Sequence, residues 1–349
     1  MLDAPDAEAF ERIEDFLAAH RGLPADLYLG YGLAGSGPPE PCPLPAAACV
    51  LRAGRGEKLG SDPVFSRYKV GAWERTWTPA QHAGAIAQAR AAIGRGDVYQ
   101  VNLVQHLRAP FRGDPAGVER ALAPLGAEFA AAMHGDGWSI VSATPELFLR
   151  TRGDRVWTMP IKGTRPADST EPIAASGKDR AEHVMIVDLE RNDLGRVCVP
   201  GSVRVSTFLE ERPMAGVRHL VSTVEGRLRP GVGLAELLRS TFPGGSVTGA
   251  PKLAAIEHIA RLEPVGRGAS MGAIGRVHPN GDLDLGLTIR TFAIAAGEIH
   301  LWVGGGIVWD SDAAEEVEES LVKARPLLRR LSAGAGDPSD GGVRIAARA

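Results

Sequence analysis

Three scarcities limit what kind of protein this chain of 349 residues can be. Cysteine is the first: the chain has only Cys42, Cys49 and Cys198, and their spacing matches neither a zinc site nor a redox motif. A disulfide framework is therefore not expected. We interpret the three cysteines as reduced thiols of a cytoplasmic protein.

Long apolar runs and an excess of basic charge are also missing. No stretch approaches the ~20 apolar residues that cross a bilayer. The acidic residues 1–16 lack the basic-then-apolar order of a signal peptide. A net charge of −3 gives no basic surface for nucleic acid. We therefore expect a protein that binds neither membranes nor nucleic acid.

What the chain does have is an alternation of helical periodicity with short apolar runs. Thr78 is a good N-cap before a helix that ends near Gly94 and Gly96. The predicted helices cover residues 8–20, 80–94, 115–123, 178–193, 233–240, 250–261 and 312–331. The predicted strands cover residues 98–108, 138–143, 146–151, 155–158, 204–209, 219–227, 271–278, 284–296 and 299–304. Tight turns between the strands indicate hairpins, so we predict an α+β fold: one sandwich of mainly antiparallel sheets with helices packed outside.

Several charged residues have spacings that could serve chemistry. Glu316, Glu319 and Lys323 share one helical face and could hold a hard cation beside a carboxylate substrate, although a solvated charged face is the simpler interpretation. Gly304 to Gly306 follow an apolar strand and could let backbone N–H groups approach an anion, or could form a bend.

Two more charged residues lie in apolar surroundings. Glu182 begins an apolar helical stripe and needs a partner, which a metal could be; it could also be a partly exposed residue near a helix start. Lys162 lies between Ile161 and a glycine turn, where a lowered pKa would make it a nucleophile; an exposed turn lysine is the alternative.

Three further features are ambiguous by themselves. The run FPGGSVTGAPK (242–252) is Gly-rich and precedes a helix, but it is not a phosphate-binding Walker pattern. Arg290, expected in a strand, is either an outward charge or a carboxylate clamp. His219 is either a core histidine or a group of the site.

Taken together and in order, these segments resemble the chorismate-utilising enzymes, a family that includes anthranilate, aminodeoxychorismate, isochorismate and salicylate synthases. The resemblance covers about residues 75–330. It is carried by GDVYQVNL (96–103), SATPELFL (142–149), PIKGTRP (160–166), AEHVMIVDLERNDLGR (181–196), GGSVTGAPK (244–252), MGAIG (271–275), TIRT (288–291) and GGGIVWDSD (304–312).

The resemblance implies a catalytic role for most of these residues. Glu182 and Glu319, with Glu316 beside them, match the family's magnesium ligands. Glu146 matches the general acid that protonates the departing 4-hydroxyl of chorismate, and His219 matches a histidine close to the ring. The predicted substrate-binding residues are Arg290, Lys323, Gly305, Gln100, Thr164 and Thr248. A silent family member would lack a magnesium ligand or the acid, and neither is missing here.

Two positions divide the family. Gln100 stands where the water-adding members have an activating lysine, which argues against isochorismate or salicylate synthesis. Lys162 stands where anthranilate synthases usually have alanine. The resemblance therefore implies that Lys162 attacks ring C2 and that ammonia then enters at C4, giving 4-amino-4-deoxychorismate for 4-aminobenzoate and folate synthesis. Anthranilate formation for tryptophan synthesis stays open as the alternative.

The resemblance also implies a partner and a division of the chain. We find no Cys-His-Glu glutaminase constellation, so a separate glutamine amidotransferase subunit is expected to deliver the ammonia. Residues 1–74 are expected to be a shortened, variable N-terminal part packed on the core. Residues 75–332 form the predicted catalytic core, and residues 333–349 a disordered tail.

Overall fold

The computed structural model of the protein describes residues 2–3, 8–35, 37–52, 67–166, 172–173, 177–214, 217–334 and 345–347. Its α-helices are α1 Ala9–Ala19, α2 Pro79–Arg95, α3 Ala116–Leu122, α4 Gly177–Gly195, α5 Leu234–Thr241, α6 Lys252–Leu262 and α7 Ala313–Gly334. Short 3₁₀ turns are η1 Tyr31–Ala34, η2 Ala123–Leu125 and η4 Gly245–Val247.

The strands build two large sheets. Those before the middle of the chain are β1 Leu2–Asp3, β2 Ala25–Leu29, β3 Ala47–Leu51, β4 Tyr68–Val70, β5 Trp73–Arg75, β6 Gln100–Gly113, β7 Ala131–Gly135, β8 Trp138–Ser142, β9 Leu147–Arg152, β10 Arg155–Met159 and β11 Ile161–Pro166. Those after it are β12 Arg204–Met214, β13 Val217–Arg227, β14 Gly249–Ala250, β15 Ala273–Val277, β16 Leu283–Leu287, β17 Thr291–Ala295, β18 Glu298–Ile307 and β19 Ile345–Ala347.

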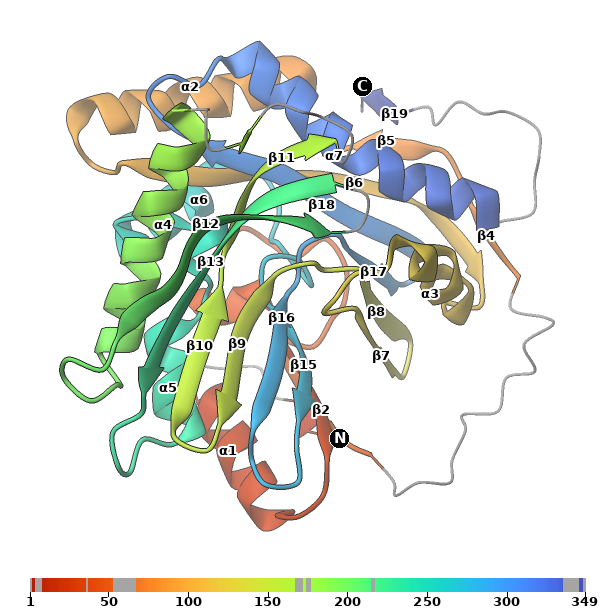
Figure 1. Cartoon of the computed structure of the whole chain (residues 1–349). Coiled ribbons are helices and arrows are strands. Elements are labelled where there is room, and N and C mark those ends of the chain that lie inside the picture. Colours follow the sequence, from red (N-terminus) through yellow and green to blue (C-terminus); the bar gives the residue numbers. More distant parts are fainter. Residues whose placement is uncertain are drawn as a thin grey trace.

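One sheet has the order β1-β3-β2-β15-β16-β9-β10-β13-β11, with β12 paired to β13. The other has the order β19-β5-β6-β18-β17-β8-β7, with β4 and β14 paired to β6. Among the described pairs, only β19 with β5 is parallel. The two sheets face each other, with helices on the outside (Figure 1). The prediction of an α+β sandwich of mainly antiparallel sheets is confirmed.

Local sequence signals explain where α2 begins and ends. Thr78 accepts a hydrogen bond from the backbone N–H of Gln81, whose side chain bonds back to Thr78, and Pro79 takes the first helical position of α2. Gly96 ends that helix in a left-handed conformation. Gly94 lies inside α2, where it gives room to the ring of Trp309.

The single strand predicted over residues 284–296 is wrong. The chain forms β16 in the ten-stranded sheet and β17 in the nine-stranded sheet, and the two are separated at residues 288–290. Arg290 has a φ of +51°, outside the strand region, so the chain turns there from one sheet into the other. Alternation of apolar residues continues across this turn, which is why periodicity does not reveal it.

Two groups of buried apolar side chains hold the layers together. The larger joins both sheets to α1, α2 and α5 and includes Leu27, Leu285 and Trp302. The smaller joins α3 and α7 to the outer face of the nine-stranded sheet through residues such as Leu107, Leu301 and Leu328. This packing fixes the start of α7 against the end of β18, where several of the predicted site residues lie.

The N-terminal residues share the main sheet with the rest of the chain, because β2 pairs with β15 along its whole length. The division at residues 74 and 75 stays a prediction. Most of the predicted tail lies outside the described residues; α7 runs to Gly334 and β19 covers residues 345–347. The three cysteines are buried and unbonded, as expected. In the described part of the chain, no helix has the length and apolar character needed to cross a membrane.

Candidate active site

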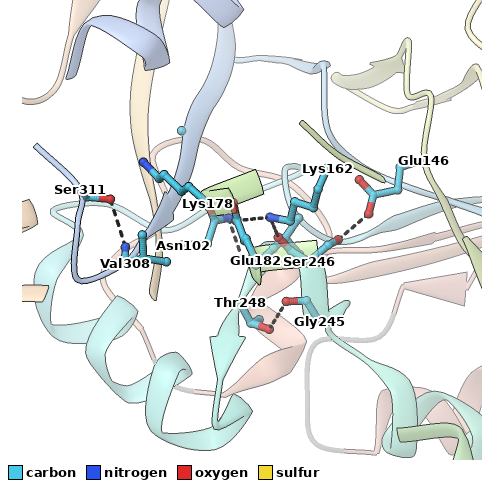
Figure 2. Close-up of polar contacts among 12 residues, drawn as sticks. Asn102, Glu146, Lys162, Lys178, Glu182, Gly245, Ser246, Thr248, Val308 and Ser311 are labelled. Carbon is cyan, nitrogen blue, oxygen red and sulfur yellow. Dashed lines mark hydrogen bonds and ion pairs between the residues drawn. The ribbon is translucent and has the colours of Figure 1, made fainter. Parts of the chain in front are cut away.

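The structure brings most of the predicted site residues to one end of the sandwich, where β11, β18 and α4 meet the loop before α6. Lys162 comes from β11, Glu182 from α4, and Glu146 directly precedes β9. Figure 2 shows Lys162 between Glu182 and Ser246, with Glu146 on the far side of Ser246. Residues distant in sequence thus form one polar cluster inside a mainly apolar fold.

Lys162 is turned into this cluster by an irregularity in its strand. The pairing of β11 with β13 shifts register between Lys162 and Arg165, and Gly163 between them has a φ of +61°. A side chain at Gly163 would also collide with Ile173. The glycine is therefore required for the bend that points the lysine inward.

The amine of Lys162 is closely paired. Its Nζ lies 2.7 Å from Glu182 Oε1 and 3.3 Å from the carbonyl oxygen of Ser246, and its side chain is 14% exposed. Burial favours the neutral amine, but the carboxylates of Glu182 and Glu146 outweigh burial and hold the pKa of Lys162 above its usual value. The lowered pKa that the sequence left open for Lys162 is not found, because the apolar neighbours in sequence are not the neighbours in space.

Glu146 is held as a buried acid. Ser246 Oγ donates a hydrogen bond of 2.5 Å to Glu146 Oε1, and the residue is 4% exposed. Burial raises the pKa of Glu146 to about 7, although the bond from Ser246 and the charge of Lys162 act in the opposite direction. A carboxyl group that is partly protonated at neutral pH suits a proton donor.

Arg290 and His219 lie beside each other. His219 Nδ1 is 2.8 Å from the carbonyl oxygen of Gly163, so this nitrogen carries the proton and donates it. His219 Nε2 is then an acceptor, and Arg290 Nη2 lies 3.4 Å from it. Burial lowers the pKa of His219, which favours this neutral form. The histidine thus orients the guanidinium of Arg290 in the bend between β16 and β17.

A second group of charges lies where β18 meets α7. Lys178 Nζ lies 3.0 Å from Glu316 Oε1, and Lys323 Nζ lies 2.8 Å from Glu319 Oε1. With the pair of Lys162 and Glu182, each of the three carboxylates predicted to bind magnesium has a lysine as its partner.

The glycines of β18 give these groups room. A Cβ atom at Gly306 would lie 2.4 Å from both Glu182 Oε1 and Gln100 Nε2. A Cβ atom at Gly305 would lie 3.2 Å from Lys323 Nζ and 3.5 Å from Glu316 Oε2. Gln100 is fully buried, and both polar atoms of its amide lack a partner among the described residues. A buried, unpaired amide in front of a glycine strand is expected to bind a ligand.

The carboxylates supply the oxygen donors that Mg²⁺ prefers, and the glycines leave space in front of them. In the described part of the chain, however, no three acidic, histidine or cysteine side chains converge closely enough to hold a metal as they stand. Three ammonium groups neutralise the carboxylates instead. The carboxylates can bind a hard cation once the lysines move away from them, so magnesium stays a proposal.

Sequence reasoning missed three residues of the cluster. Lys178 lies four residues before Glu182 and so on the same face of α4, a spacing that could have revealed it. Ser246 belongs to the GGSVTGAPK segment, and Glu190 lies two turns beyond Glu182. Glu190 Oε2 accepts a hydrogen bond of 3.0 Å from Thr158 Oγ1. Burial, together with the charge of Glu146, raises the pKa of Glu190 to about 8.

Two predicted substrate-binding residues add little to the geometry. The hydroxyl of Thr248 lies 3.0 Å from the carbonyl oxygen of Gly244 and 3.2 Å from that of Gly245, so it stabilises its own loop. Thr164 lies in β11, and its side chain is outside the described part of the structure.

A cavity of about 760 Å³ lies away from this cluster, between α3, β7 and the strands β15 and β16. Phe129, Arg150 and Arg276 are among its lining residues, and none of the predicted site residues whose side chains the structure describes lines it. Cavity size therefore does not locate the candidate site; the convergence of buried charges does.

Comparison with known proteins supports the assignment of the fold and the family. Residues 54–329 match the family described as chorismate binding enzyme. The chain is 42% identical over 279 residues to aminodeoxychorismate synthase component 1 of Klebsiella aerogenes, covering 77% of this chain and 62% of that protein. It is also 42% identical over 277 residues to anthranilate synthase component 1 of Streptomyces coelicolor, covering 75% of this chain and 54% of that protein.

Among solved structures, anthranilate synthase component I from Streptococcus pneumoniae is similar, with a TM-score of 0.79 and 27% identity over 88% of this chain and 81% of that one. The chain spans 62% and 54% of the lengths of the two curated relatives, which differ in their named activity. The relatives therefore leave the individual reaction open, but the match over most of the sequence establishes that the chain belongs to the chorismate-binding enzyme family.

Proposed function

We propose that this protein aminates chorismate at C4 and so makes 4-amino-4-deoxychorismate. The observation that carries the proposal is the position of Lys162, an amine inside the polar cluster 2.7 Å from Glu182 and within the electrostatic reach of Glu146. An enzyme that delivers ammonia directly to C2 has no need of a second amine at this place.

The proposed reaction has two displacements with the same pattern. The amine of Lys162 attacks ring C2, the ring double bonds shift, and the 4-hydroxyl leaves as water with a proton from Glu146. Ammonia then attacks C4, the double bonds shift back, and the bond between C2 and Lys162 breaks. Hydroxide is a poor leaving group, so a positioned acid is needed, and the raised pKa of Glu146 supplies one near neutral pH.

The surrounding residues would bind the two carboxylates of the substrate. Arg290 is oriented by His219, and Lys323 lies at the glycines of β18. Magnesium would be held by Glu182, Glu316 and Glu319, and when bound it would supply positive charge for the ring carboxylate. The ammonia would come from a separate glutamine amidotransferase subunit, as the names of the "component 1" relatives suggest.

The test is to incubate the full chain with chorismate, magnesium and ammonium, and to identify the products with and without added aminodeoxychorismate lyase. We expect 4-aminobenzoate only when the lyase is present. Anthranilate without the lyase would contradict the proposal and favour the activity named for the Streptomyces coelicolor relative.

A matched pair of variants separates the two roles open to Lys162. Lys162→Ala removes both the charge and the nucleophile, whereas Lys162→Arg keeps the charge. If the amine forms a bond to C2, both variants lose formation of 4-amino-4-deoxychorismate. If arginine retains most of the wild-type rate, the lysine acts by its charge alone.

A further inference from the structure

Lys178 is the one lysine of the three ion pairs that has no part in the proposed reaction. It lies in the first turn of α4, and its Nζ is 3.0 Å from Glu316 Oε1. The two partners differ in exposure: the side chain of Lys178 is 44% exposed, whereas that of Glu316 is 7% exposed. A half-exposed ammonium therefore covers a buried carboxylate from the solvent side.

The carboxylate of Glu316 is fixed independently of this lysine. Ser311 Oγ donates to Glu316 Oε1 over 2.7 Å and accepts from the backbone N–H of Val308 over 3.1 Å. Figure 2 shows Ser311 turned toward Val308, near Lys178. Glu316 Oε2 is directed toward the space in front of Gly305. Removal of the lysine would thus leave the carboxylate in place.

The unpaired amide of Gln100 indicates independently that a ligand enters this space. Gln100 is fully buried, its two polar atoms lack partners among the described residues, and its Nε2 converges with Glu182 Oε1 on the same point in front of Gly306. Buried polar atoms without partners are rare in folded proteins unless water or a ligand satisfies them.

We propose that Lys178 competes with the divalent cation for Glu316, so that the lysine must leave this carboxylate when the cation binds. This inference rests on the magnesium part of the proposed function, not on which product is formed. A cation bound at Glu316 Oε2, the oxygen that faces Gly305, would lie on the same carboxylate as Lys178 Nζ, which contacts Oε1, and two like charges this close repel each other. Because Lys178 is half exposed, its ammonium can turn into water, so the competition lowers cation affinity without blocking it.

The experiment measures cation binding by the full chain without chorismate, with Mn²⁺ as a paramagnetic probe and Mg²⁺ as its competitor. Lys178→Gln is expected to bind Mn²⁺ about five- to tenfold more tightly than the wild type. Lys178→Arg keeps the charge and should bind as the wild type does. Lys69→Gln, a substitution of an exposed residue in β4, should change nothing.

Equal or weaker binding by Lys178→Gln would overturn the proposal, and so would an absence of Mn²⁺ binding in every variant. A second measurement uses the wild type only: Mn²⁺ should increase the labelling of Lys178 by an amine-reactive ester, followed by mass spectrometry. Unchanged labelling under saturating Mn²⁺ would also overturn it. An anthranilate product would refute C4 amination yet leave both binding results intact, so the two failures are distinguishable.

Discussion

The two ends of the candidate site place the same residue type in opposite electrostatic conditions. At the end near η4, burial raises the pKa of Glu146 to about 7, and burial with the charge of Glu146 raises that of Glu190 to about 8. At the end near α7, burial alone would raise the pKa of Glu319, but Lys323 and Lys178 hold it below its usual value. Burial thus raises the pKa of two carboxyl groups at one end, whereas ammonium groups lower that of Glu319 at the other.

The difference follows from how each end is built. Glu146 accepts from a neutral hydroxyl, Ser246 Oγ, and Lys162, the cation with the largest effect on its pKa, is hydrogen-bonded to another carboxylate, that of Glu182. Glu316 and Glu319 each have an ammonium of their own within 3.0 Å. A glutamate paired with its own ammonium group suits the binding of a cation by the glutamate or of a carboxylate by the ammonium. A glutamate whose neighbouring cation is paired with another carboxylate suits proton transfer.

The largest expected effect comes from removing the acidic proton of Glu146. Glu146→Gln keeps the shape of the side chain but cannot donate to the departing hydroxyl, so we expect kcat to fall by about 10²–10⁴. The measurement is the initial rate of 4-amino-4-deoxychorismate formation in the coupled assay with the lyase.

The control for this variant comes from the other end of the site. Glu319→Gln weakens the proposed cation site, so part of its lost rate should return at high magnesium concentration. The rate of Glu146→Gln should not respond to magnesium. Recovery of Glu146→Gln by magnesium would make this glutamate part of the proposed cation site and contradict its role as the acid.

The sequence predicts the arrangement near α7 better than the arrangement near η4, and the reason is distance along the chain. Glu316, Glu319 and Lys323 share one helix, so their common face follows from helical spacing alone. The hydroxyl that contacts Glu146 comes from Ser246, 100 residues away, and no local pattern pairs the two. The resemblance to the family supplies the role of Glu146, but not its hydrogen bond or its pKa.

The fold shows the same division between local and distant information. The limits of α2 follow from Thr78 and Gly96, which act within one turn of the helix. The break at Arg290 cannot be read locally, because it depends on the chain leaving one sheet for the other. The raised pKa of Lys162 likewise depends on Glu182 of α4, which apolar neighbours in sequence do not reveal.

An intermediate effect is expected for Glu190, and it concerns how the free energy of unfolding depends on pH. Its pKa is about 8 in the folded protein, above the usual value of 4.5, so its contribution to stability is fully present below pH 4.5 and is lost as the pH rises through 8. Glu190→Gln cannot ionise and avoids this loss. The variant should therefore become more stable than the wild type as the pH rises toward 9, by on the order of a few kcal/mol.

Calorimetric melting of both proteins between pH 5 and pH 9 measures this difference. Glu257→Gln, at an exposed position of α6, should shift the unfolding free energy by less than about 0.5 kcal/mol. A constant difference between Glu190→Gln and the wild type across the pH range would show that Glu190 is already ionised at pH 5.

The smallest expected effect concerns the pH at which the plot of kcat/KM against pH changes slope. The proposed attack needs Glu146 protonated and Lys162 neutral. The pKa of Glu146 is about 7 and that of Lys162 lies above its usual value. Above pH 7, most of the free protein therefore has Glu146 ionised and Lys162 protonated instead. The reactive form then increases up to about pH 7 and stays level above it, until Lys162 itself loses its proton. We expect kcat/KM, at a fixed concentration of unprotonated ammonia, to bend near pH 7.

Ser246→Ala tests whether this bend belongs to Glu146. The bond from Ser246 Oγ stabilises the charged carboxylate, so its removal should raise the pKa of Glu146 and move the bend to higher pH by up to about one unit. The level rate above the bend should rise by the same factor, because more of the protein then holds a protonated Glu146 beside a neutral Lys162. The backbone carbonyl that Lys162 contacts is kept in this variant. Ser202→Ala, near the exposed Arg227, should leave the bend in place. A decline of kcat/KM above pH 7 in the wild type would mean that Lys162 gives up its proton before Glu146 does, and that the lysine is released from Glu182 before the chemistry begins.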